Sequence, residues 1–167
     1  GKMGSALLTQ WSDGASRNVP QHSFFVVHPT ADIGDNTAQV TFMRAPPSVE
    51  DSVFDLVIVA VKPQIVDAVL PDYAPRLAAG GFVASIAAGC SIARLRTLSG
   101  GAPVVRVMPN LPAAIGAGVT GLCADPSASA AQRDAIEALM AAAGMVLWVD
   151  SEDKLDRLTA IAGSGPG

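Results

Sequence analysis

The chain has 167 residues, a length that suits one domain; half of the residues are hydrophobic and 16% are charged. The net charge is −4 and no basic stripe is present, which argues against nucleic acid as a partner. The longest apolar run, residues 138–149, contains a glycine and is too short to span a bilayer, and the first residues lack the pattern of a cleavable signal.

The hydrophobic residues predict strands and helices that alternate along the chain. Met3, Leu7 and Trp11 recur at four-residue spacing and predict a helix over residues 3–16. Strands are predicted at residues 24–27, 40–43, 55–61, 82–87, 104–108, up to 122, and 145–149. Further helices are predicted to open at Pro63 and to cover residues 92–98, 129–143 and 151–161. We therefore expect an α/β fold with a doubly wound, mostly parallel, Rossmann-like sheet, whose buried strands explain the apolar bias.

Residue types that bind metals or act as nucleophiles are sparse. Cys90 and Cys123 do not have the spacing of metal ligands, and we interpret them as reduced thiols of a cytoplasmic protein. His22 and His28 are too few for a metal cluster and are interpreted as loop or strand-end residues. We predict no metal site, and we find no Ser-His-Asp set, carboxylate pair or catalytic cysteine.

The first four residues, Gly1-Lys2-Met3-Gly4, match the last four positions of Gly-x-Gly-x-x-Gly. In that fingerprint the glycines let the backbone approach a pyrophosphate, whose charge the following helix N-terminus stabilises. So short a motif also fits a simple capping loop, but the predicted helix and strand after it favour a nucleotide site. The first strand and first glycine of the fingerprint would lie just upstream of Gly1. Either the sequence is clipped there or the domain lacks its central strand.

The residues directly after the predicted strand 24–27, His28-Pro29-Thr30, bear on which nucleotide is bound. Enzymes selective for NAD usually place an acid here for the ribose 2′-hydroxyl, and this stretch has none. The Thr30 hydroxyl and nearby amides suit a 2′-phosphate, so we expect NADPH. No arginine is adjacent, which leaves NADH open, and Thr30 has the alternative role of starting a turn.

Three further stretches follow predicted strands, where a doubly wound sheet places its ligand crevice. In Ala60-Val61-Lys62-Pro63 the lysine either meets a phosphate or points to solvent. The small residues Ala87 and Ala88 permit a flat ring to lie close to the backbone. Asn110 either holds a carboxamide or ribose or forms an Asx turn before a proline.

Five motifs in one order resemble those of pyrroline-5-carboxylate reductase. That family shows Gly-x-Gly-x-Met-Gly-x-Ala, Ala-Val-Lys-Pro, Ala-Ala-Gly, Arg-x-Met-Pro-Asn-Thr-Pro and Ser-Gly-Ser-Gly-Pro-Ala-Tyr. This chain has the corresponding runs at residues 1–6, 60–63, 87–89, 106–112 and 163–166. Leu111 stands where Thr is usual, which removes a hydroxyl near the nicotinamide site. Gly167 stands where Ala is usual, and Ala162 where Ser is common.

The resemblance implies that residues 1–162 form an NADPH-binding domain and that residues 163–167 begin the connection to a helical domain absent from this chain. In the family the helical domain makes a dimer or higher oligomer and supplies most of the substrate site. The nicotinamide delivers a hydride to the C=N bond of a cyclic imino acid in the last step of proline synthesis, without a catalytic side chain. The isolated chain is therefore expected to be inactive and to expose an apolar patch near Leu155, Leu158 and Ile161.

Two rival interpretations remain at this stage. One is another NADP-dependent reductase of the same broad superfamily, which would share the glycine-rich turn but not the later motifs. The other is a reductase-like protein that binds nucleotide as a sensor or scaffold, an interpretation that Leu111 favours.

Overall fold

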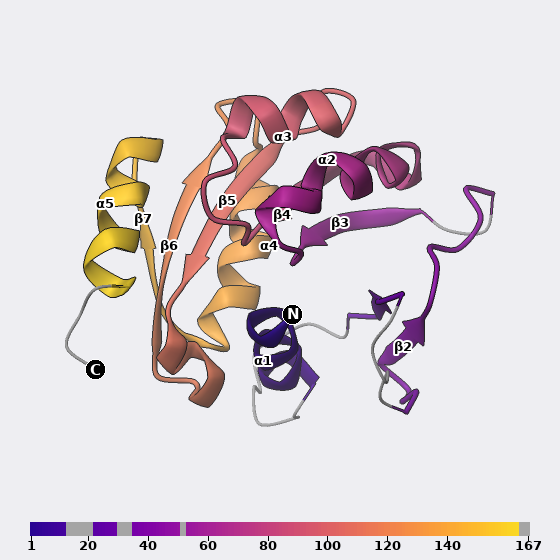
Figure 1. Ribbon diagram of the computed structural model, residues 1–167, viewed down its shortest axis with the longest axis horizontal. Helices are drawn as coiled ribbons and strands as arrows, with labels where there is room; N and C mark the ends of the chain where they lie inside the picture. The colour runs from indigo at the N-terminus through magenta and orange to yellow at the C-terminus, as the bar shows by residue number, and fades with distance from the viewer. Residues whose placement is uncertain (13–21, 30–34, 51–52, 164–167) are drawn as a thin grey trace.

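The computed structural model describes residues 1–12, 22–29, 35–50 and 53–163, and side chains as far as residue 160. A five-stranded sheet in the order β3-β4-β5-β6-β7 forms its centre (Figure 1). Its strands are Phe54–Val59 (β3), Leu77–Ser85 (β4), Val104–Pro109 (β5), Gly118–Ala124 (β6) and Gly144–Trp148 (β7). All neighbouring pairs are parallel except β5 with β6. The predicted α/β fold with a mostly parallel, Rossmann-like sheet is thereby confirmed.

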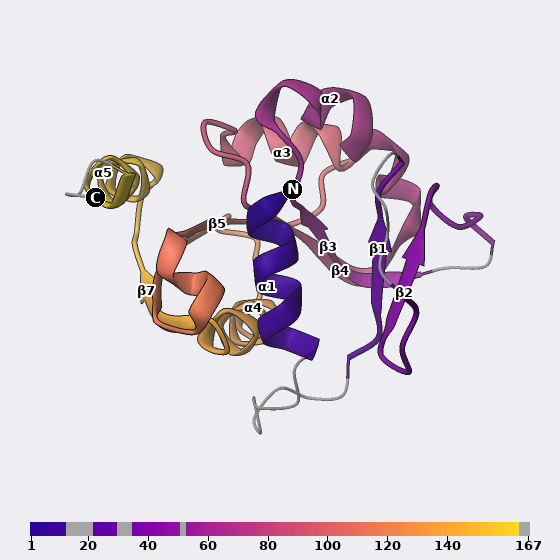
Figure 2. The ribbon, with the colours of Figure 1, turned by 60° about the horizontal axis from the view of Figure 1, so that its bottom comes forward.

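Helices cover both faces of this sheet. The α-helices are Lys2–Ser12 (α1), Val66–Val69 (α2), Ile92–Leu98 (α3), Ala130–Ala141 (α4) and Glu152–Gly163 (α5). Short 3-10 turns lie at Pro63–Ile65 (η1), Leu70–Asp72 (η2), Ala74–Arg76 (η3) and Leu111–Ile115 (η4). Figure 2 shows α2 and α3 on one side of the sheet and α1 and α4 on the other. None of the helices in the described ranges combines the length and the hydropathy that crossing a bilayer requires.

Each face has its own hydrophobic core. On one face, Leu7 and Trp11 of α1 pack with Ile136 and Met140 of α4 over the buried strand residue Leu122. The Trp11 indole Nε1 donates to the carbonyl of Leu139 over 2.8 Å, so its polar atom is satisfied within that core. The other core lies under α2 and α3, and it includes Val66, Leu70, Val83, Leu95 and Val104. The N-terminus of α1 is thereby held at the edge where β3 ends.

A second, two-stranded sheet lies beside the first. Its parallel strands Phe24–Val27 (β1) and Val40–Met43 (β2) pair from Phe24↔Val40 onward, and within the described residues neither is hydrogen-bonded to β3. Aromatic packing joins this pair to the rest. Trp11 stacks on Phe24 at 5.7 Å, and Phe25 meets Phe54 edge-on at 5.6 Å between ring centroids.

Several predicted boundaries move. The first helix ends at Ser12, and residues 13–16 lie outside the described ranges. The helix expected at Pro63 is a series of short turns, because prolines recur at positions 63, 71 and 75 and each lacks a backbone donor. Strand β4 begins at Leu77, earlier than predicted, with a shift of its register against β3. Ser129 and Gln132 form a capping box that fixes the start of α4.

The prediction of an exposed apolar patch on α5 is wrong for the two of its three residues whose side chains the structure describes. Leu155 is fully buried and Leu158 is half-buried, because α5 packs onto β6; the side chain of Ile161 lies outside the described residues. Large exposed apolar side chains occur instead on η4 and β7. They include Leu111 (84% exposed), Ile115 (79%) and Met145 (69%).

Candidate functional site

The glycine-rich turn lies directly against the end of β3. Helix α1 begins at Lys2, and the amide of Ser5 donates to the carbonyl of Gly1 over 3.0 Å. A β-carbon on Gly4 would lie 2.9 Å from that of Ala60, closer than two such atoms approach in proteins. Only glycine therefore fits at position 4 without displacing the strand end, as the predicted fingerprint requires.

A hollow of about 260 Å³ opens where α1 starts. It brings together residues of the first two sequence motifs and Ile86, which directly precedes the third. Its lining residues are Gly1, Lys2, Met3, Gly4, Ala60, Val61, Lys62 and Ile86. The first amides of an 11-residue helix have no intrahelical partner, and the helix dipole favours negative charge at this end. The hollow therefore has the chemistry of an anion site with apolar walls.

Ile86 is the lining residue that the sequence analysis missed. It follows β4 directly, and its amide donates to the carbonyl of Val59 over 3.0 Å, which holds it beside the end of β3. Ala87 is instead buried in the core under α2 and α3, with its amide donating to the Ser85 hydroxyl over 3.2 Å, and Ala88 is exposed beyond it. Neither alanine lines the hollow. The signal that could have found Ile86 is its place next to Ala60 at neighbouring strand ends.

The remaining predicted residues have different surroundings. Lys62 is exposed at the rim of the hollow, and its carbonyl accepts from Ile65 over 3.1 Å; Pro63 occupies the first position of η1 and does not line the hollow. Thr30 lies outside the described residues, although the strand before it is placed by the His28 amide, which donates to Met43 over 3.0 Å.

Asn110 connects β5 to β6. Its side-chain Oδ1 accepts from the amide of Val119 over 2.9 Å, and it does not line the hollow. Asn110 Oδ1 is therefore used in a bond that spans η4 rather than in an Asx turn before Pro112, which was one of the two alternatives for this residue. Leu111, the departure from the family pattern, stands next to it and points into solvent.

A network of one buried arginine and two more exposed carboxylates joins β5 to α5. The Arg106 side chain is 4% exposed, and its guanidinium contacts Glu152 at 2.9 Å and Asp156 at 2.8 Å. Burial by itself lowers the pKa of Arg106, but the two carboxylates outweigh it and hold that pKa above its usual value. The sequence analysis assigned Arg106 no role, because hydrophobic periodicity does not predict which charged residues on different helices and strands form ion pairs.

The described residues contain no group of three or more His, Cys, Asp or Glu side chains placed to hold a metal ion. Cys90 and Cys123 are both buried and unpaired with each other. Burial, followed by the charge of Glu152, raises the pKa of the Cys123 thiol.

Comparison with known proteins connects this geometry to one family, although no family model matches the chain. The chain is 44% identical over 113 residues to a pyrroline-5-carboxylate reductase of Pseudomonas aeruginosa, covering 67% of this chain and 41% of that protein. It is 41% identical over 138 residues to the reductase of Mycobacterium tuberculosis, covering 78% of this chain and 45% of that protein. A solved Plasmodium falciparum pyrroline carboxylate reductase with NADP bound superposes with a TM-score of 0.80 at 26% identity, over 99% of this chain and 60% of that one.

The resemblance indicated by the five motifs is thereby confirmed. The chain spans less than half the length of these two curated relatives.

Proposed function

We propose that this relative of the pyrroline-5-carboxylate reductases is the NADPH-binding domain of an enzyme that reduces 1-pyrroline-5-carboxylate to L-proline. The observation that carries the proposal is the contact of Gly4 with Ala60 at the mouth of the hollow. The absence of a β-carbon at position 4 leaves a cradle beside a helix N-terminus, which fits a pyrophosphate. NADP in the solved Plasmodium relative supports this choice of cofactor.

The bound cofactor would supply the hydride, and the residues of this chain would bind and orient it. We propose that Gly1, Lys2, Met3 and Gly4 hold the pyrophosphate, that Ala60, Val61 and Lys62 form the facing wall, and that Pro63 turns the chain away directly after it. Thr30 would bind the 2′-phosphate, and Ala87, Ala88 and Asn110 would form the nicotinamide end. Ile86 joins this set, because its side chain lines the hollow.

The division of labour is also part of the proposal. Residues 1–162 would form the cofactor domain, and the substrate site and the dimer would depend on a helical part that follows residue 163. The alignments cover less than half of each of the two curated relatives, which supports this division. The enzyme would act on a small imino acid in the cytoplasm.

A sensor that binds nucleotide without turnover is the second candidate. One observation favours it: Leu111 exposes an apolar side chain where the family pattern has a hydroxyl. The sensor would bind NADPH as the reductase does, so only turnover by the complete protein separates the two.

Calorimetric titration of the chain with NADPH and NADH tests the cofactor assignment. We expect tighter binding of NADPH. The variant Thr30→Glu should reverse the preference, because a carboxylate repels a 2′-phosphate and suits a ribose hydroxyl. A chain that binds neither nucleotide would overturn the proposed function, while an unchanged preference in Thr30→Glu would move the phosphate site elsewhere.

A further inference from the structure

Arg106 holds a position where an unpaired charge would be strongly destabilising. It lies on β5 between the core residues Val105 and Val107, and its side chain faces the opposite side of the sheet. Nη1 donates to Glu152 and Nη2 donates to Asp156, so one guanidinium uses two nitrogens on two carboxylates. Charge-assisted bonds of this kind are short and directional, and they fix geometry as well as charge.

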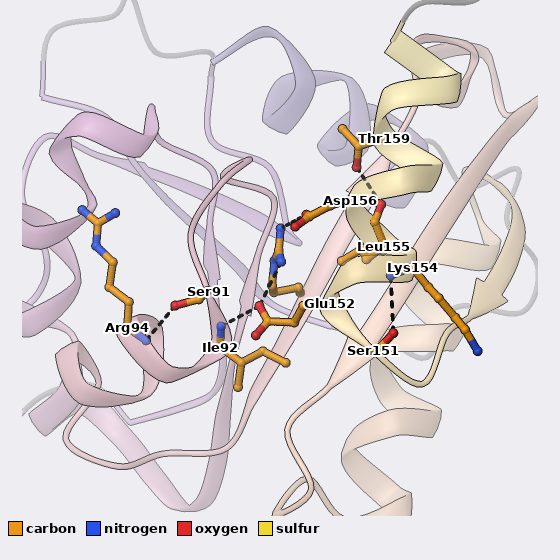
Figure 3. Close-up of polar contacts among 10 residues, drawn as sticks. Ser91, Ile92, Arg94, Ser151, Glu152, Lys154, Leu155, Asp156 and Thr159 are labelled. Atoms are coloured by element: carbon orange, nitrogen blue, oxygen red, sulfur yellow. Dashed lines mark hydrogen bonds and ion pairs between the residues drawn. The ribbon is translucent and has the colours of Figure 1, made fainter.

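The two carboxylates lie one turn apart on the same face of α5. Glu152 also binds a second element, because its Oε1 accepts from the amide of Ile92, the first residue of α3, over 2.9 Å (Figure 3). Ser91 caps α3 by accepting from Arg94 over 3.2 Å, and the Ile92 amide would otherwise lack an acceptor. A single carboxylate therefore ties α5 to both β5 and α3.

Apolar packing also holds α5 against the sheet. A β-carbon on Gly121 of β6 would lie 2.8 Å from Leu155 Cδ1, so the Leu155 side chain fills the space that this glycine leaves open. Leu155 itself is fully buried. Packing of Leu155 at Gly121 and ion pairing at Arg106 therefore both act on the position of α5.

The three joined segments are those that carry the later sequence motifs. Strand β5 leads to Asn110, α3 follows the loop of Ala87 and Ala88, and α5 ends at Gly163, where the last motif begins. We infer that Arg106 is a positioning residue, which sets the direction in which the chain leaves α5 relative to the strand ends at the crevice. The inference rests on the proposed function, in which the part after α5 holds the imine.

This role separates hydride transfer from cofactor binding. The hollow beside Gly4 shares no lining residue with the contacts of Arg106. A shift of α5 therefore leaves the nucleotide cradle intact. It would misplace the acceptor, and a displacement of about 1 Å is enough to lower turnover about a hundredfold.

Hydrogen exchange of the chain tests whether Arg106 holds α5 in place. Arg106→Met should speed exchange of amides 156–160 by about tenfold or more, because it leaves two carboxylates without their cation. Arg106→Lys, which reaches one carboxylate at a time, should restore part of the protection. The control Arg94→Met removes an exposed pair with Asp67 and should leave α5 unchanged. Unchanged α5 exchange in Arg106→Met, or an equal increase in every helix, would overturn the inference.

Kinetics of the complete reductase tests whether the position of α5 affects hydride transfer. Arg106→Met should lower kcat by about a hundredfold, while KM for NADPH stays within about twofold. An unchanged kcat, or a loss that appears only in KM for NADPH, would contradict a positioning role. Where Arg106→Met fails to fold, Asp156→Asn serves instead, because that carboxylate is 58% exposed and its amide keeps the shape. A wild-type chain that binds no NADPH would refute the proposed function independently of the exchange result.

Discussion

Gly4 on α1 and Ala60 after β3 lie so close that one added methyl group would meet the other residue's β-carbon at 2.9 Å. The contact joins the start of a helix to the end of a strand far away in the sequence. It sets the depth of the hollow at the helix N-terminus, because a larger residue at either position would fill the space that the proposed pyrophosphate needs.

Gly4→Val should abolish most NADPH binding while the fold persists. The added side chain has to push α1 away from Ala60, which displaces the amides proposed to hold the pyrophosphate. Calorimetry measures the affinity, and circular dichroism checks the fold. Ser5→Val is the matched control, because position 5 is exposed on the same helix and receives the same side chain. Equal NADPH affinity in a folded Gly4→Val variant would remove this loop from the binding site.

The sequence was informative where one local pattern determines the structure. The spacing of Met3, Leu7 and Trp11 predicted α1, and the apolar run before Ala60 predicted β3. Those predictions brought Gly4 and Ala60 to one crevice, because parallel strands present their carboxyl ends at the same edge.

What the sequence did not predict depends on pairing between distant segments. The antiparallel direction of β6 is one such feature, since the strand pattern is the same in either direction. The contact of Arg106 with Asp156 spans 50 residues and leaves no periodic signal. Ile86 was missed for a related reason. The sequence analysis assigned the cofactor-binding role to its neighbours Ala87 and Ala88 because they are small, and it could not show which residue lies beside Ala60.

Asn110→Ala should lower turnover of the complete enzyme more than it lowers stability. The variant loses the bond from the Val119 amide, and because Val119 is partly exposed water can replace it, so we expect a cost of about 0.5–1.5 kcal/mol. Turnover should fall further if the amide also orients the nicotinamide. Chemical denaturation and steady-state kinetics measure the two effects. A collapse of the melting temperature with normal activity per folded molecule would make Asn110 a purely structural residue.

The Cys123 thiol should resist alkylation at pH 8 in the folded chain and react once the chain is unfolded. Burial, more than the charge of Glu152, raises its pKa, so little thiolate forms at that pH. The linkage has a definite sign: the folded state keeps its proton longer than the unfolded state, so this group's contribution to stability is lost as pH rises above the usual thiol pKa. Mass spectrometry after iodoacetamide treatment, with and without urea, measures the difference. Rapid modification of Cys123 in the folded chain would contradict the assigned burial.

Residues 1–167 by themselves should not reduce 1-pyrroline-5-carboxylate, even with NADPH present. The hollow beside Gly4 is the proposed nucleotide site, whereas the described residues contain no second site assigned to the imine. Hydride transfer needs the donor and acceptor carbons in near-attack geometry, and such positioning can contribute roughly 7–11 kcal/mol to lowering the barrier. A domain that holds only the donor forgoes most of that effect. The measurement is a steady-state assay of this chain beside a complete relative, with NADPH oxidation followed at 1-pyrroline-5-carboxylate concentrations that saturate the relative. Comparable turnover by this chain would place the substrate site within these residues and would overturn the proposed division at residue 163.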